Sequence, residues 1–167
     1  MKFREATLSD LATIVSIYNE IIAEGGFTAD LAPYSVEDKL EWFKATNNNE
    51  LGVWIIEEHE KVIGYFYFSH WRNGRKALLH TKEVSVFIGK EYRNKGIGKE
   101  ALRFAISIAQ QRKLRVLLAI LMDNNERSKK VLTTMGFTTV GILKNVAEVN
   151  GKIIDQCIMQ FQLSTSE

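Results

Sequence analysis

The chain has 167 residues, a formal net charge of +2 and a single cysteine. The length predicts one domain covering residues 1–167, and the balanced charge argues against a protein that mainly neutralises a nucleic-acid backbone. Cys157 cannot form an internal disulfide, the longest apolar run covers only residues 116–122, and residues 1–10 contain no apolar signal core. We therefore expect a cytoplasmic protein that does not span a membrane.

The first part of the chain predicts a strand followed by two helices. Residues 2–6 predict a short strand, and Ser9 or Asp10 is a candidate N-cap for the first helix. After a break at residues 24–34, Ser35 and Asp38 have the spacing of a capping box at the start of a second helix. The first helix has one apolar stripe at helical spacing, formed by Leu11, Ile14, Val15, Tyr18, Ile21 and Ile22.

The rest of the chain predicts six strands and two helices. The strands are expected at residues 51–58, 61–71, 80–88, 115–121, 138–149 and 152–161, the last two around the hairpin signal Asn150-Gly151. One helix follows residues 80–88 with Ile97, Ala101, Ala105 and Ala109 on one stripe, and a shorter helix ends at Gly136. The order β-α-α-β-β-β-α-β-α-β-β predicts an α+β, or mixed α/β, sheet with helices on its faces.

A basic, glycine-rich turn, EYRNKGIGKEAL at residues 91–102, separates the expected strand 80–88 from the helix that follows. A strand that leads through glycines into a helix directs several backbone N–H groups at one point, where the helix dipole adds positive charge. Arg93, Lys95 and Lys99 add full charges, and Gly96 and Gly98 let a bulky ligand approach the backbone. A pyrophosphate group fits this pattern.

Three interpretations of the turn are open from the residues alone. The turn does not match the P-loop pattern, but Gly96-x-Gly98-x-x-Ala101 fits the dinucleotide-binding pattern G-x-G-x-x-A. That pattern belongs early in a βαβ unit with an acidic residue at the end of the next strand, and here no acidic residue follows until Asp123. The glycines could also serve only to tighten a strand–helix turn. The third interpretation draws on more of the chain.

Arg93-x-x-Gly96-x-Gly98 resembles the pyrophosphate-binding motif (Q/R)-x-x-G-x-(G/A) of the GCN5-related N-acetyltransferase (GNAT) superfamily. The order of predicted elements agrees with that family over nearly the whole chain. Further fragments resemble its phosphinothricin and methionine sulfoximine acetyltransferase branch: IYNEII, EWF, HWR, HTKEVSVFI, GFTTVG and NGKIIDQCIM. The resemblance implies a central, mostly antiparallel, twisted sheet of about seven strands with helices on both faces.

The resemblance implies transfer of acetyl from acetyl-coenzyme A (acetyl-CoA) directly to a primary amine, with no metal. The acceptor would be a small molecule, such as an amino acid or an amino-acid analogue. Backbone N–H groups of a strand that parts from its neighbour would polarise the thioester. The cofactor-binding residues would be Val86, Phe87, Ile88, Arg93, Asn94, Lys95, Gly96, Ile97, Gly98, Lys99, Asn125 and Ser128. Ser128 is equally well explained as a helix-capping residue.

Glu83 occupies the position of the glutamate that this branch carries just before the cofactor turn. The resemblance implies that it is the general base, acting through a water if needed, and partial burial would raise its pKa toward the working range. The alternative is an ordinary exposed strand glutamate. Family members often carry Tyr or His where this chain has Leu132, so the usual general acid for the leaving thiolate is replaced here. A thiol with a pKa of about 8.5 can leave unprotonated.

The acceptor pocket is the least defined part of the prediction. Arg72 could bind a substrate carboxylate, although a plain surface role fits it equally well. The expected acceptor residues are Phe27, Trp71, Arg72, Asn73, Thr81 and Ser85. His59, His70 and His80 do not have the spacing of metal ligands, and no nucleic-acid motif is present.

Three alternatives to a small-molecule acetyltransferase stay open. The chain could acetylate a protein N-terminus or lysine, it could be a CoA-binding regulatory module without catalysis, or it could bind a nucleotide. Dimers are common in the resembling branch, so a homodimer is an expectation as well.

Overall fold

A computed structural model describes residues 1–164 of the chain. Seven strands form one sheet in the order β1-β2-β3-β4-β5-β7-β6, with antiparallel pairs throughout except for the parallel pair β4–β5. The strands are β1 (Lys2–Glu5), β2 (Val53–Glu58), β3 (Lys61–His70), β4 (Thr81–Ile88), β5 (Val116–Met122), β6 (Thr138–Val149) and β7 (Lys152–Gln162).

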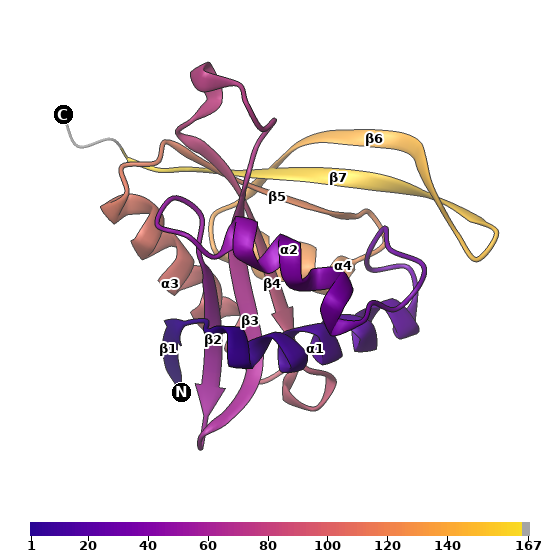
Figure 1. Cartoon of the computed structure of the whole chain (residues 1–167). Coiled ribbons are helices and arrows are strands. Elements are labelled where there is room, and N and C mark those ends of the chain that lie inside the picture. Colours follow the sequence, from indigo (N-terminus) through magenta and orange to yellow (C-terminus); the bar gives the residue numbers. More distant parts are fainter. Residues whose placement is uncertain (165–167) are drawn as a thin grey trace.

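Four α-helices cover the two faces of the sheet (Figure 1). They are α1 (Leu11–Glu24), α2 (Val36–Thr46), α3 (Ile97–Gln111) and α4 (Glu126–Thr134). One apolar core joins α1 and α2 to one face, and a second core packs α3 and Leu132 of α4 on the other. The predicted order of elements, the number of strands and the mostly antiparallel α+β sheet are confirmed.

The ends of several elements follow from local chemistry. Ser35 and Asp38 form the predicted capping box of α2, and Gly136 follows α4 with a left-handed φ of 92°. The first helix begins at Leu11 with Asp10 at its N-cap position, as predicted, but the Asp10 side chain forms no capping hydrogen bond with α1. Its carboxylate instead accepts a hydrogen bond from the backbone N–H of Thr7 at 2.8 Å and pairs with Arg4, which adds a short 3₁₀ turn (Leu8–Asp10) before α1.

The long β6–β7 hairpin extends beyond the rest of the sheet (Figure 1). Asn150 and Gly151 both have positive φ values, 52° and 73°, as the predicted two-residue turn requires. β3 ends one residue earlier than predicted, at His70, because the chain reverses through residues 71–74, where Arg72 and Gly74 adopt positive φ.

The parting of β4 and β5 creates the site. The two strands pair only through Thr81–Val116, Lys82–Leu117 and Glu83–Leu118. Beyond Glu83 the strands separate, so the remainder of β4 is paired with β3 alone. This is the V-shaped opening that the resemblance implies, and Glu83 lies at its vertex.

Candidate active site

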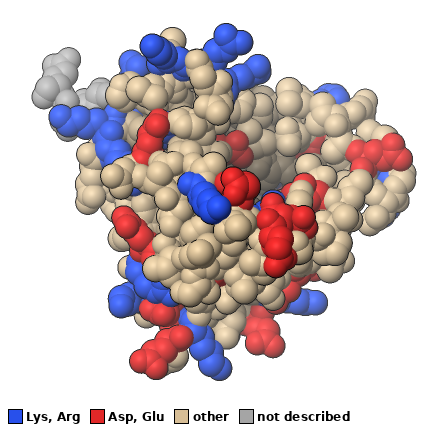
Figure 2. All heavy atoms as spheres, viewed as in Figure 1, with Lys and Arg blue, Asp and Glu red and all other residues tan. Residues whose placement is uncertain are grey.

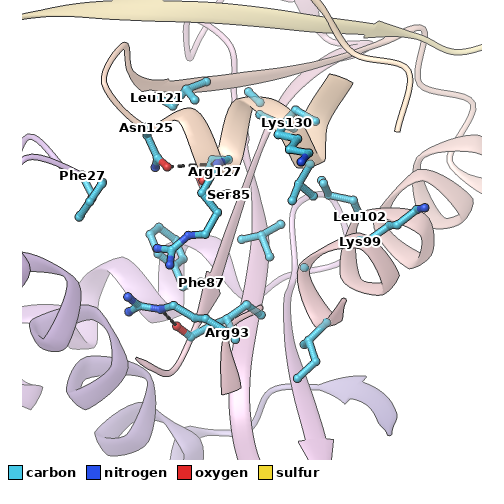
Figure 3. A pocket seen from close by; sticks show the side chains of 18 of the residues that line it. Phe27, Ser85, Phe87, Arg93, Lys99, Leu102, Leu121, Asn125, Arg127 and Lys130 are labelled. Carbon is cyan, nitrogen blue, oxygen red and sulfur yellow. Dashed lines mark hydrogen bonds between the residues drawn. The ribbon is translucent and has the colours of Figure 1, made fainter. Parts of the chain in front are cut away.

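A cavity of about 500 Å³ occupies the opening between β4 and β5. It is bounded by the second half of β4, the glycine turn, the start of α3, the end of β5, and α4. Thirteen of the residues predicted from the sequence line it: Phe27, Ser85, Val86, Phe87, Ile88, Arg93, Asn94, Gly96, Ile97, Gly98, Lys99, Asn125 and Ser128. The structure therefore gathers residues from distant parts of the chain around one space (Figure 3).

The glycine turn has the conformation that an anion site needs. Gly96 adopts φ 80° and caps α3, a left-handed geometry that residues with a side chain rarely adopt. A Cβ added at Gly98 would meet no heavy atom within 4 Å, so this glycine is not required by packing. The first N–H groups of a helix have no intrahelical acceptor and therefore remain available to a ligand at this end of α3.

Positive charge concentrates in the cavity although the whole chain carries only +2. Arg93, Lys99, Arg127 and Lys130 line it, and none of the lining residues that the structure describes is acidic. Figure 2 shows that the face carrying α1 and α2 is hollowed below the β6–β7 hairpin. A ligand with several phosphate groups fits this balance better than a neutral one.

Arg93 is held in place by the protein itself. Its Nη1 donates to both carboxylate oxygens of Glu24 at 2.6 and 2.7 Å, and its Nε donates to the Ile88 carbonyl oxygen at 2.8 Å. Its Nη2 is buried and has no hydrogen-bond partner in residues 1–164. The paired nitrogens tie the glycine turn to the end of α1, and the two N–H groups of Nη2 have no acceptor within residues 1–164.

Asn125 and Ser128 start α4 together. The Asn125 side-chain oxygen accepts a hydrogen bond from the Ser128 backbone N–H at 3.1 Å, which makes Asn125 the N-cap (Figure 3). Both residues also line the cavity, so the cap places the Asn125 amide at its wall. The sequence predicted both positions and left a capping role open for Ser128, whereas the structure gives that role to Asn125.

Glu83 is half-buried on the face of β4 that packs against α1 and α2, as the alternation of the strand requires. Burial raises the pKa of its carboxyl above the ordinary value of 4.5. No hydrogen bond to this carboxylate forms within residues 1–164, and its charge in turn helps to raise the pKa of Tyr67. Such a carboxylate is a better proton acceptor than an exposed one.

Six predicted residues do not line the cavity: Glu83, at the vertex of the β4–β5 opening, and the five described next. Trp71, Arg72 and Asn73 follow β3 in a turn, where Arg72 is exposed and stacks on Trp71 with its guanidinium 5.5 Å from the ring centre. Thr81 pairs with Val116 before the strands part, and Lys95 lies 5.5 Å from the ring centre of Tyr92 instead of lining the cavity.

Other lining residues were not predicted as functional. They include Tyr92, Leu102, Arg127 and Val131. Arg127 could have been predicted from the sequence, since it lies between Asn125 and Ser128, which were both predicted to bind the cofactor. Leu132 is buried and also lines the cavity, whereas the thiol of Cys157 is buried in β7 outside it.

Comparison with known proteins agrees with this geometry. The model of the acetyltransferase (GNAT) domain family matches residues 3–158. The chain belongs to the GNAT acetyltransferase family. As a GNAT protein it is an acyltransferase of a family that binds acetyl-CoA, and the predicted resemblance is confirmed.

Relatives place this GNAT protein nearest the phosphinothricin and methionine sulfoximine acetyltransferase branch. YwnH of Bacillus subtilis (strain 168), whose name assigns it provisionally to phosphinothricin acetyltransferase, is 34% identical over 98% of this chain and 100% of its own length. The L-amino acid N-acyltransferase MnaT of Escherichia coli (strain K12) is 28% identical over 98% of this chain and 94% of its own length.

A solved structure extends the likeness to a cofactor complex. The phosphinothricin acetyltransferase of Sinorhizobium meliloti, in complex with acetyl-CoA, has a TM-score of 0.91 and 29% identity, covering 98% of this chain and 88% of that one.

In residues 1–164, no group of three or more His, Cys, Asp or Glu side chains is arranged to hold a metal ion. No helix in the same range is both long and apolar enough to cross a bilayer.

Proposed function

We propose that this GNAT protein transfers acetyl from acetyl-CoA to the primary amine of a small amino acid or amino-acid analogue, of the phosphinothricin or methionine sulfoximine type. One observation carries the proposal: a basic cavity opens where β4 and β5 part, and a half-buried, unpaired carboxylate, Glu83, lies at its vertex. The names of the relatives support the acceptor class.

The cofactor would bind along β4 and the glycine turn. The backbone of Val86–Ile88, which lies beyond the last β4–β5 pair, would bind the pantetheine arm and polarise the thioester carbonyl. Gly96, Gly98 and the nearby N–H groups of α3 would bind the pyrophosphate, and the lysine side chain of Lys99 would add charge. Asn125 would donate its amide to the pantetheine from the opposite wall.

Catalysis would then require one proton transfer to the protein. Glu83 accepts a proton from the acceptor ammonium, directly or through a water, and the neutral amine attacks the thioester carbonyl carbon. The C–N bond forms, the C–S bond breaks, the amide nitrogen loses its second proton to water, and CoA leaves as the thiolate. The side chain of Leu132 cannot supply a proton, and a thiol with a pKa of about 8.5 can leave without one. Because Cys157 lies outside the cavity, an acyl-enzyme on that thiol is not part of the proposal.

A second candidate is a CoA-binding regulatory module that does not catalyse transfer. The buried Leu132 at the position where many family members carry Tyr or His favours it. The unpaired Glu83 favours the enzyme, since a regulatory module has no need for a buried carboxylate without a partner.

Release of free thiol from acetyl-CoA by the purified protein distinguishes the two candidates. Phosphinothricin, methionine sulfoximine, the common amino acids, polyamines and short peptides serve as acceptors, and isothermal titration calorimetry measures acetyl-CoA binding. We expect turnover with amino acids or their analogues. Binding without turnover on any acceptor would support the regulatory module, and turnover confined to peptides would support protein acetylation.

Three properties of the whole chain complete the proposal. Residues 1–167 would form one acetyltransferase domain, which the single continuous sheet supports. The protein would be cytoplasmic, consistent with one free, buried cysteine. It would act on a small molecule as a monomer or homodimer, and light scattering of the purified protein measures which.

A further inference from the structure

The cavity has two basic sides that differ in their surroundings. In Figure 3, Lys99 of α3 and Lys130 of α4 lie on the side of the cavity where α3 runs. Arg127 lies on the other side, where its side chain extends from α4 into the cavity toward Arg93 and Phe87, in the same part of the view as Phe27. The glycine turn would bind the pyrophosphate of acetyl-CoA, and Lys99 and Lys130 would bind its remaining phosphate, which leaves the charge of Arg127 unassigned.

Arg127 is exposed and forms no ion pair and no side-chain hydrogen bond within residues 1–164. Its acidic neighbour on α4, Glu126, is bound by Lys129 at 3.0 Å instead. Arg93 differs, because Glu24 neutralises it. Arg127 is therefore a guanidinium without a counterion within residues 1–164, and it lines the same cavity as Phe27, the α1–α2 loop residue that the sequence predicts for acceptor binding.

We propose that Arg127 binds the carboxylate of the acceptor amino acid and so determines the preference for acceptors that carry a negative group next to the amine. This inference rests on the proposed function. A planar guanidinium can donate two parallel hydrogen bonds to a carboxylate, which fixes orientation as well as charge. The acceptor amine then projects from this anchor toward the β4 residues Ser85 and Glu83, where β4 and β5 meet.

Arg127 takes the role in binding the acceptor carboxylate that the sequence suggested for Arg72. Arg72 was the sequence candidate for the carboxylate, but it is exposed in the turn after β3, where its guanidinium lies over the Trp71 ring. Lys39 is the other candidate, because it lines a separate crevice of about 160 Å³ between α1, α2 and β3. That crevice also contains Asp30, whose charge would repel a carboxylate.

The test is the steady-state kinetics of Arg127→Gln with paired acceptors. Each acceptor is used as the amino acid and as its carboxamide, which keeps the amine and removes the negative charge. We expect Arg127→Gln to raise KM for the amino acid about tenfold or more, the effect of one lost charge-assisted hydrogen-bond pair. The KM for the carboxamide and the Kd for acetyl-CoA should change less than twofold. Arg127→Lys should fall between the wild type and Arg127→Gln.

Two matched variants serve as controls. Arg103→Gln removes an exposed positive charge from α3, where Arg103 pairs with Glu100 away from the cavity, and should leave both KM values unchanged. Arg72→Gln removes the alternative candidate and should change the KM for the amino acid less than Arg127→Gln does. Because the Arg127 side chain forms no ion pair and no hydrogen bond within the described residues, Arg127→Gln should fold. Circular dichroism checks this.

Several results would overturn the inference. The first is weaker binding of acetyl-CoA by Arg127→Gln with an unchanged KM for the amino acid. The second is a larger rise in that KM for Arg72→Gln than for Arg127→Gln. The third is a wild type that acetylates carboxamides or polyamines as well as amino acids. In each of these cases the protein remains an acetyltransferase. Failure of the proposed function is distinct, since it gives no thiol release with any acceptor, and it would remove this inference too.

Discussion

Lys82 and Glu83 are neighbours on β4, but Lys82 forms an ion pair, whereas Glu83 has no partner within residues 1–164. The Lys82 side chain is 2% exposed, and its ammonium donates to Glu50 at 2.8 Å and lies 2.9 Å from Nδ1 of His70. This hydrogen bond lowers the pKa of Glu50. Glu83 points to the other face of the strand, is half-buried, and has a raised pKa because burial is not offset by any partner.

The difference teaches how a structural charge can be told from a candidate catalytic one. Burying a charge costs free energy unless it is paired, so an unpaired buried group needs another explanation. Lys82 is paired at the closed end of the sheet. Glu83 lies one residue further, at the vertex of the β4–β5 opening, where a proton acceptor would be used.

The largest expected effect is on catalysis. Glu83→Gln should lower kcat by about 10²- to 10⁴-fold, the usual contribution of a positioned general base. Its Kd for acetyl-CoA should stay within twofold of the wild type, because Glu83 does not line the cavity. Initial rates of thiol release and calorimetric titrations measure the two quantities. A variant that keeps the wild-type kcat would show that the unpaired carboxylate has no role in proton transfer.

The paired side of the comparison is tested through stability. Glu50→Ala should lower the free energy of unfolding by about 2 kcal/mol, because Lys82 stays buried with only His70 as a partner. The value is below that for a fully buried pair, since Glu50 is itself 52% exposed and water can replace it. Lys82→Met should be neutral or stabilising, because it removes the buried charge and leaves Glu50 to solvent. Urea denaturation measures both, and equal losses in the two variants would contradict this picture.

Two glycines extend the comparison to backbone positions. A Cβ at Gly64 would lie 2.6 Å from the Phe87 carbonyl oxygen, whereas a Cβ at Gly98 would meet nothing within 4 Å. Gly64→Ala should therefore destabilise the fold by about 1–3 kcal/mol. Gly98→Ala should keep or slightly raise stability, since alanine favours a helix, and should weaken acetyl-CoA binding about tenfold by obstructing the approach to the turn. Unchanged acetyl-CoA affinity in Gly98→Ala would argue against the turn as the pyrophosphate site.

The smallest expected effect is on the pH dependence of stability. The folded pKa of Glu83 is above the unfolded value of 4.5, so the folded state holds this proton to higher pH and loses stability as pH rises between the two values. Glu83→Gln cannot ionise and should be slightly more stable than the wild type at pH 7. The gain should vanish below pH 4.5. It is small, because water still reaches this half-buried carboxylate. Thermal melts of both proteins across pH measure this difference in stability. A variant that is less stable than the wild type at pH 7 would contradict the prediction.

Local features of the fold could be predicted from the sequence, because local chemistry determines them. The Ser35–Asp38 capping box, the Asn150-Gly151 hairpin and the glycine turn each depend on a few adjacent residues. The cavity residues on β4 and α3 followed from the family resemblance. All of these positions lie where a short sequence pattern specifies a backbone conformation.

The remaining features depend on contacts between distant residues. The Arg93–Glu24 pair joins residues far apart in sequence, so no local pattern reveals that this arginine is neutralised. The direction of the long Arg127 side chain is set by where α4 packs. Arg72 was predicted for acceptor binding from its place at the end of the third strand, and the positive φ values at Arg72 and Gly74 that put it in an exposed turn have no local sequence signal that was used.

The most direct test is the titration of the Glu83 carboxyl by ¹³C NMR, with Glu83→Gln used to assign the resonance. We predict that this carboxyl titrates above pH 4.5, as a buried group without a partner must. A titration at or below 4.5 would show that the carboxylate is solvated or paired, and would contradict its assignment as the general base of this GNAT protein.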